Sequence, residues 1–284
     1  MKKKKKVALY VLLTVVVLGL FSYYQNNSIT TTNMSIQSDQ IPEAFNGYKV
    51  VQLSDLHSKS FGKNQRVLVE KVKETNPDVI VFTGDLVDSK KYNEENSVVL
   101  MELLTSIAPV YYVSGNHEWW SERFATLEER LTSAGVKVLR NSSEVIEREN
   151  EQIHIVGIDD PAIQPFLEEG ETTDKAITKA LEGIDPAEHF TILLAHRPEY
   201  FGIYAEHELD LALAGHAHGG QVRIPFIGGV VAPNQGFFPE YTSGTYTEAD
   251  SKMIVHRGLG NSIIPQRIFN RPEIIVITLA SKNE

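Results

Sequence analysis

The sequence has no cysteine among its 284 residues. This absence excludes disulfide bonds, thiolate nucleophiles, thiolate zinc sites and iron–sulfur clusters. A metal site in this chain must therefore be built from imidazole, carboxylate or amide ligands. The length suits one large domain or two small ones, and the hydrophobic fraction of 42% is that of an ordinary globular core.

Positive charge is scarce outside the first six residues. The formal net charge is −10, and without Lys2–Lys6 the remaining chain carries −15. A body this acidic repels nucleic acid at long range. We therefore expect no nucleic-acid partner.

The N-terminus combines those lysines with an apolar run from Val7 to Tyr24. As a helix rising ~1.5 Å per residue, the run would span roughly 27 Å, close to the ~30 Å hydrocarbon core of a membrane. It ends in bulky residues, which favours an uncleaved signal-anchor over the alternative of a cleaved secretory signal. Because lysines stay in the cytoplasm, residues 1–24 predict a single-pass transmembrane helix in the cell membrane, with the rest of the chain on the extracytoplasmic side.

Two regions follow this anchor. Residues 25–47 begin with a stretch rich in Asn, Ser and Thr, which is typical of a tether and could include a first edge strand. From residue 48 to 284, short runs rich in Val and Ile alternate with amphipathic stretches, which indicates an α/β catalytic domain. The predicted strands are Tyr48–Leu53, Val79–Thr83, Val110–Ser114, Ile153–Ile158, Phe190–Ala195, Leu209–Ala214, Met253–His256 and Ile274–Leu279. The predicted helices are Asn64–Thr75, Glu94–Ser106, Glu122–Ala134 and Asp174–Leu181.

Polar residues directly follow five of these strands. They are Asp55 and His57, Asp85, Asn116 with His117, His196, and His216 with His218. Because ligands bind beyond the carboxyl ends of strands in α/β sheets, these segments can deliver their side chains to one crevice. Asp55 and His57, like His216 and His218, are two residues apart, and in an extended chain such side chains point the same way. Each pair could therefore hold one ion.

The ligand types narrow the choice of metal. Imidazole and carboxylate groups together with an amide oxygen suit Mn²⁺, Fe or Zn²⁺ better than Mg²⁺ or Ca²⁺. Glycines precede Asp85, Asn116 and His216, and they allow tight turns where the strands end. The sequence thus predicts a centre with two divalent or transition metal ions (Mn, Fe or Zn).

The motifs Asp-x-His, Gly-Asp, Gly-Asn-His-Glu, His and Gly-His-x-His, in this order, resemble those of the calcineurin-like metallophosphoesterases. The resemblance covers about residues 48–279, and the anchor and the Gly219-Gly220-Gln221 continuation are similar to a membrane-associated bacterial branch of that family. It implies a four-layer α/β/β/α sandwich with two metal ions bridged by Asp85, and His117 as the catalytic histidine. One ion would be held by Asp55, His57, Asp85 and His218, and the other by Asp85, Asn116, His196 and His216.

The chemistry of the residues agrees with that implication. Two cations ~3.5–4 Å apart would acidify a shared water and stabilise the oxygens of an in-line displacement. We therefore expect hydrolysis of a phosphomonoester or phosphodiester by metal-bound hydroxide, with His117 protonating the leaving oxygen. Glu118 would either orient His117 or lie exposed at a helix start. The alternatives are a catalytically silent metal-binding or scaffold module on the same fold, or a nuclease.

Other residues allow two interpretations each. Arg197 could hold a phosphate, or pair with Glu199 or a carbonyl group. Trp119 and Trp120 could line a substrate cleft or pack in the core. Residues 222–241 are predicted to be loops and short hairpins, which could form an apolar lip for a lipid-like substrate or pack at a sheet edge. Asp159 and Asp160 could approach the site or serve as turn residues before Pro161. Structural or surface roles are expected for His154, His189, His207 and His256.

Overall fold

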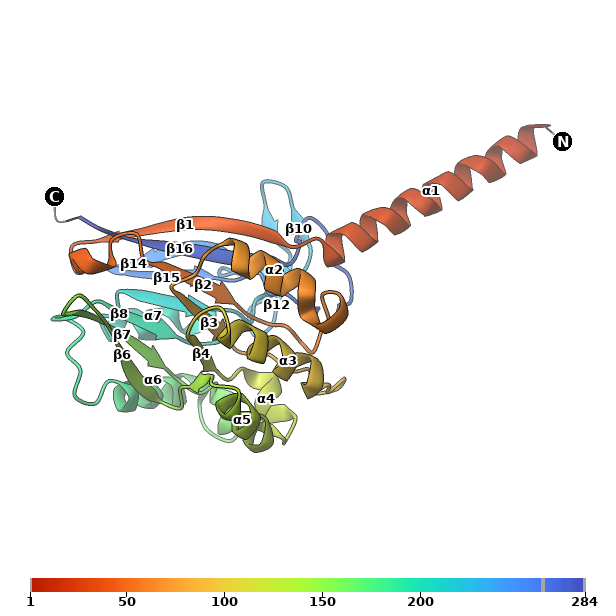
Figure 1. Cartoon of the computed structure of the whole chain (residues 1–284). Coiled ribbons are helices and arrows are strands. Elements are labelled where there is room, and N and C mark those ends of the chain that lie inside the picture. The colour runs from red at the N-terminus through yellow and green to blue at the C-terminus, as the bar shows by residue number, and fades with distance from the viewer. Residues whose placement is uncertain (1, 262–263, 283–284) are drawn as a thin grey trace.

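The structure, a computed structural model, describes residues 2–261 and 264–282 (Figure 1). Two six-stranded mixed sheets form its centre, with strand orders β1-β16-β2-β3-β4-β5 and β14-β15-β9-β8-β7-β6. The first sheet consists of β1 (Thr30–Ser38), β2 (Lys49–Leu53), β3 (Val79–Thr83), β4 (Val110–Val113), β5 (Lys137–Val138) and β16 (Glu273–Ser281). The second consists of β6 (Ser142–Arg148), β7 (Glu151–Gly157), β8 (Thr191–Leu194), β9 (Leu211–Ala214), β14 (Gly244–Glu248) and β15 (Ser251–Val255).

Helices cover the outer faces of both sheets. Those of the first sheet are α2 (Arg66–Glu74), α3 (Glu94–Thr105), α4 (Asn116–Trp120) and α5 (Phe124–Ser133), and those of the second are α6 (Glu169–Ala180) and α7 (Phe201–Glu206). Two small hairpins, β10 (Arg223–Ile224) with β11 (Gly228–Gly229) and β12 (Val231–Ala232) with β13 (Gly236–Phe237), follow β9.

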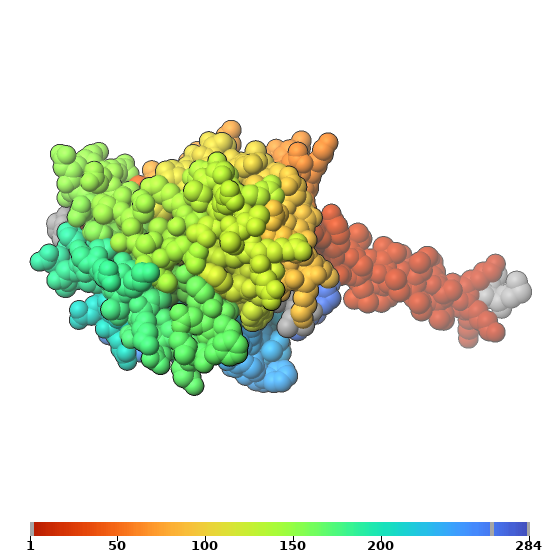
Figure 2. Space-filling model, turned by 90° about the horizontal axis from the view of Figure 1, so that it is seen from below, coloured from red at the N-terminus to blue at the C-terminus, as the bar shows by residue number. Residues whose placement is uncertain are grey.

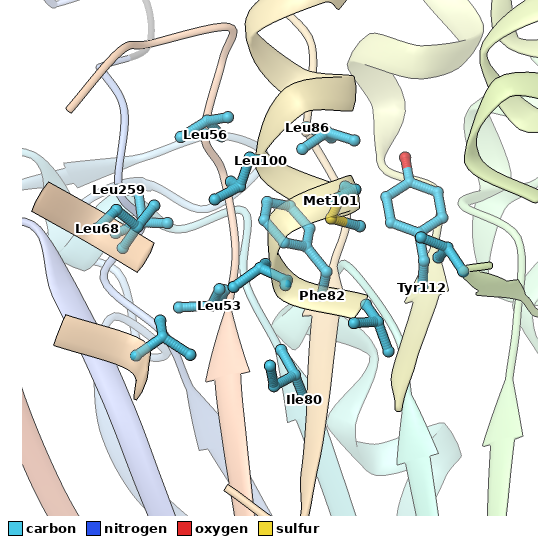
Figure 3. Close-up of a cluster of buried hydrophobic side chains, with 14 of the residues drawn as sticks. Leu53, Leu56, Leu68, Ile80, Phe82, Leu86, Leu100, Met101, Tyr112 and Leu259 are labelled. Atoms are coloured by element: carbon cyan, nitrogen blue, oxygen red, sulfur yellow. The ribbon is translucent and has the colours of Figure 1, made fainter. Parts of the chain in front are cut away.

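Three buried apolar clusters hold these layers together. One joins the facing sides of the two sheets and includes Val81, Leu213 and Ile277. A second lies between the first sheet and its helices, where Figure 3 shows Leu68 and Met101 beside the strand residues. A third packs α6 and α7 on the second sheet. The four-layer α/β/β/α sandwich is therefore confirmed.

All eight predicted strands and four predicted helices are present, but several elements were not predicted. β6 and β14 are edge strands whose side chains are mostly exposed or half-buried, so they lack the apolar runs that marked the others. α4 and α7 have only five and six residues. Such elements depend on their neighbours rather than on their own sequence pattern.

The N-terminal helix α1 (Lys2–Asn27) projects from the domain (Figure 1). Its apolar window is long enough to cross a membrane, and none of that window is buried against the domain. β1 begins at Thr30 and pairs in parallel with β16 over nine residues. β1 follows α1 almost directly and lies within residues 25–47, where the sequence indicated a short tether and allowed an edge strand.

Candidate metal centre

Six of the seven predicted ligands lie in two buried groups that share Asp85. The first group consists of Asp55, His57, Asp85 and His218, and the second of Asp85, His196 and His216. The seventh, Asn116, is buried, and its Oδ1 has no hydrogen-bond partner among the described residues. Five separate loops thus bring their polar side chains together at one edge of the two sheets.

In the first group, side-chain nitrogen and oxygen atoms of four residues lie within 4.8 Å of one another. Nε2 of His57 lies 3.0 Å from Nε2 of His218 and 3.5 Å from Oδ2 of Asp85. Nε2 of His218 lies 3.3 Å from Oδ1 of Asp55. Two carboxylates facing two imidazoles at these distances are a donor set that fits a divalent cation.

In the second group, the backbone of β3 orients the ring of His196. Nδ1 of His196 lies 2.7 Å from the carbonyl oxygen of Thr83, so it carries the proton and donates to that oxygen. Nε2 of His196 then faces Oδ2 of Asp85 at 3.3 Å and Nδ1 of His216 at 3.2 Å. This arrangement leaves the nitrogen that faces the centre available as a ligand.

The backbone corrects one argument made from the sequence. Asp55, His57, His216 and His218 have φ values of 52°, 49°, 62° and 47°, so neither Asp-x-His nor His-x-His is extended. His216 and His218 also belong to different groups, so the two side chains are not placed to bind the same ion. Left-handed turns deliver these side chains to the centre, and such backbone strain is concentrated at functional sites.

Two glycines allow the loops to approach closely. A Cβ atom on Gly215 would lie 2.0 Å from Oγ of Ser54, and one on Gly84 would lie 2.5 Å from Nδ1 of His196. Gly84 also has a φ of +86°. Any larger residue at either position would push the ligand loops apart.

Burial sets the charge of these histidines. It lowers the pKa of His57 to about 4 and lowers the pKa values of His216 and His218 as well, so they are neutral near pH 7. Neutral imidazole is the form that binds metal. Burial also opposes ionisation of His196, but the adjacent Asp85 carboxylate raises its pKa to about 10. A cation bound there would take the place of that proton.

Glu118 is fully buried under Asp85, which contradicts the expectation of an exposed carboxylate. Its Oε2 accepts hydrogen bonds from the backbone N–H groups of Asp85 (2.9 Å) and Gly115 (2.6 Å), and its Oε1 accepts from that of Val87 (3.1 Å). Burial raises the pKa of Glu118 to about 8, while these donors favour the ionised form. Glu118 therefore joins the loops after β3 and β4.

His117 lies beside the centre and is oriented by a residue that the sequence did not indicate. Its Nδ1 accepts a hydrogen bond of 3.0 Å from the backbone N–H of Ser89, so in the neutral ring Nε2 carries the proton. The ring lies edge-on to His57, with 4.5 Å between centroids, and 5.3 Å from the ring of Trp120. Trp120 is 57% exposed, whereas Trp119 packs on Phe124.

Two further residues near the centre had no recognisable motif. Arg267 is fully buried, and its Nη2 lies 3.4 Å from Nδ1 of His218. Glu199 is half-buried, neither of its carboxylate oxygens has a hydrogen-bond partner among the described residues, and Oε1 lies 3.8 Å from Nε2 of His216. Each residue lies against the ring nitrogen of a predicted ligand histidine that faces away from the centre. No local sequence pattern indicates either contact.

The remaining candidates have other partners. Arg197 forms a two-pronged ion pair with Asp160, at 2.8 and 3.1 Å, and its contact with Glu199 is longer at 3.7 Å. Asp159 pairs with Arg140 at 2.6 Å. The four other histidines lie outside both groups: His154 stacks on His189, His207 pairs with Asp174, and Nδ1 of His256 accepts from a backbone N–H.

Two buried Asp/His groups sharing one carboxylate, at the carboxyl edge of a four-layer sandwich, define a metallophosphoesterase. The family model for calcineurin-like phosphoesterases matches residues 48–220, and the chain belongs to this family.

Several relatives support this assignment. The chain is 32% identical to the uncharacterized metallophosphoesterase YkuE of Bacillus subtilis, over 93% of this chain and 90% of that protein. It is 31% identical to a bovine transmembrane protein with a metallophosphoesterase domain, covering 96% of this chain but only 62% of that protein. It is 29% identical to phosphodiesterase YaeI of Escherichia coli over 82% of each chain. The solved structure of TT1561 from Thermus thermophilus has a similar fold, with a TM-score of 0.50 at 15% identity, over 75% of this chain and 90% of that one.

Proposed function

We propose that the protein is a membrane-anchored phosphoesterase that uses two metal ions to hydrolyse a phosphodiester or phosphomonoester. The observation that carries this proposal is the sharing of Asp85 by two buried groups of metal-binding side chains. A diester is the favoured substrate class because the relative from Escherichia coli is named a phosphodiesterase. The convergence of all the ligand side chains argues against a catalytically silent module, in which some of them would be lost.

The ligand assignment follows from the two groups. Asp55, His57, Asp85 and His218 would hold one ion, and Asp85, Asn116, His196 and His216 the other. Manganese, iron and zinc suit this mixture of imidazole and carboxylate. Two such ions supply an acidified water and neutralise the charge of the phosphoryl oxygens.

His117 would act on the leaving group. Because Ser89 donates to Nδ1, the proton on Nε2 is available for the departing oxygen. Asp85 also accepts a hydrogen bond of 2.9 Å from the backbone N–H of His117, which ties this residue to the bridging carboxylate. His117 is therefore positioned by contacts that do not depend on its own ring binding a metal.

We further propose that α1 crosses the cell membrane with the domain on the extracytoplasmic side. Its apolar length and its five lysines at the N-terminal end support this orientation.

The test uses the full chain purified in detergent. Metal analysis should find about two transition-metal ions per chain, and chelation should abolish hydrolysis of nitrophenyl and alkyl phosphoesters, with recovery when metal is returned. Asp85→Asn and His216→Ala should lose metal and activity while remaining folded. His207→Ala is the matched control, because its imidazole pairs with Asp174 outside both groups. Metal-free protein with activity insensitive to chelation would contradict the proposal.

A further inference from the structure

The strand directions place the metal centre at the anchored end of the domain. β1 starts directly after α1 and runs parallel to β16, and β16 runs antiparallel to β2. The carboxyl end of β2 therefore lies at the same end of the sheet as the start of β1. Because β3 and β4 are parallel to β2, the loops with Asp55, Asp85 and Asn116 all emerge at the end where α1 is attached.

Specific contacts fix the base of α1 to the loops of the centre. The side chain of Asn26 accepts a hydrogen bond of 2.8 Å from the backbone N–H of Arg267, whose guanidinium group lies against His218. The carbonyl group of Asn26 accepts from Lys59, which follows His57 by two residues. The base of α1 is thus held beside the loops of the metal centre.

The loop of residues 264–271 lies at the depth of the apolar part of α1. The ring of Phe269 packs edge-on against that of Phe21, with 5.9 Å between centroids, and Arg271 donates to the hydroxyl group of Tyr24. Aromatic residues such as Tyr23 and Tyr24 mark the boundary between hydrocarbon and water in membrane helices. Since Phe21 precedes that boundary within α1, Phe269 must lie at the membrane interface when α1 spans the bilayer.

The two small hairpins that follow β9 present further exposed apolar side chains. The first is joined to the 264–271 loop through a bridge between Val222 and Ile268, and its turn presents Phe226, which is fully exposed. The second presents Phe237 and Phe238, which are 78% and 66% exposed. Figure 1 shows the hairpin beside β10 rising on the side from which α1 leaves, and in Figure 2 light-blue atoms protrude from the lower edge of the domain while darker blue atoms lie near the base of α1.

We propose that the hairpin tips and Phe269 lie in the interface of the lipid bilayer that α1 crosses, and that the metal centre takes its phosphoester from an amphiphile held in the same bilayer. This inference rests on the proposed function and adds a substrate class to it. The apolar tips, which we call the lipid-facing rim (Phe226, Phe237, Phe238 and Phe269), are covered by lipid because they continue the surface of a membrane helix. A substrate with an acyl or alkyl tail would reach the centre without leaving the membrane.

The first experiment measures depth. The chain has no cysteine, so Phe226→Cys and Phe238→Cys each accept a single nitroxide label. In full-length protein in nanodiscs of phosphatidylcholine and phosphatidylglycerol, both labels should be more accessible to oxygen than to a water-soluble nickel complex. A label at Asn150→Cys, in the turn between β6 and β7 at the opposite end of the strands, should show the reverse. Labels that are equally accessible to the nickel complex at all three positions would overturn the proposed membrane contact. The lipid-facing rim would then lie in water or against a partner other than lipid.

The second experiment measures the substrate class with two esters that have the same leaving group. The hexadecyl diester of nitrophenyl phosphate enters the nanodisc, whereas the methyl diester stays in water. The wild type should hydrolyse the hexadecyl ester at least about tenfold faster at equal total concentration. Replacing Phe226 and Phe238 by serine should reduce that rate at least about fivefold and leave the methyl ester within about twofold.

Val145→Ser, which removes an exposed apolar side chain from β6, is the control and should change neither rate. If neither ester is hydrolysed, the diesterase form of the proposed function fails, and the amphiphile inference fails with it, independently of the depth measurement. If the methyl ester is hydrolysed but the hexadecyl ester has no advantage, only the amphiphile inference fails.

Discussion

Glu118 offers the sharpest test of how the fold positions the centre. Its carboxylate accepts three backbone hydrogen bonds, and Glu118→Ala would leave the N–H groups of Asp85, Val87 and Gly115 buried without acceptors. A buried donor that loses its partner costs about 1–3 kcal/mol, and water entering the vacated space would recover part of this. We therefore expect Glu118→Ala to lower the free energy of unfolding by about 3–5 kcal/mol.

Glu118→Gln keeps the shape of the side chain but turns an amide N–H₂ group toward at least one of the three donors. We expect it to lose about 1–3 kcal/mol and to retain metal less well, because the loop that carries Asp85 shifts. Urea denaturation followed by far-ultraviolet circular dichroism, with a chelator present throughout, measures stability without a contribution from bound metal.

The control is Glu128→Gln, which removes a half-exposed ion pair with Arg140 and should cost less than about 1 kcal/mol. A loss below about 1 kcal/mol for Glu118→Ala would refute the reasoning, because it would mean that the three N–H groups find other acceptors.

Three more predictions follow from the site and the anchor. His117→Ala should keep both metals and lose about 10²–10⁴-fold activity on an alkyl ester but distinctly less on a nitrophenyl ester, since nitrophenolate leaves without a proton; equal losses would argue for phosphate positioning instead. Protease added outside intact cells should digest the chain beyond Gln25, and digestion only after lysis would reverse the orientation. Glu199→Ala should weaken retention of one metal ion by about 10- to 100-fold through His216, as measured by competition with a chelator, whereas unchanged affinity would make its approach to that histidine incidental.

Much of the fold was predictable because its central strands are covered on both faces. Runs such as Val79–Thr83 are fully buried, so their sequence is apolar without alternation. β1 and β6 could not be recognised with the same certainty, since each lies at a sheet edge and buries few side chains. Their position depends on strands far away in the sequence.

The predicted ligands come together because each follows a strand that ends at the same edge. What the sequence could not provide is the support around them. Ser89 is 28 residues from His117, and Arg267 is 49 residues from His218, and neither lies in a motif. Glu118 stood next to a predicted residue, yet its burial depends on the short helix α4, which turns its side chain under the loop of Asp85.

The pairing of β1 with β16 has a consequence for the order of synthesis. The strand that follows α1 is also the partner of a segment far along the chain, Glu273 lying opposite Thr30. As the proposed membrane helix, α1 would be made long before this partner exists, so β1 stays unpaired until β16 has been synthesised. Contacts between such distant segments form late and slow folding. β1 therefore pairs with the sheet of the metal centre only after β16 has been made, and a product lacking β16 would keep β1 unpaired and exposed to quality-control proteases.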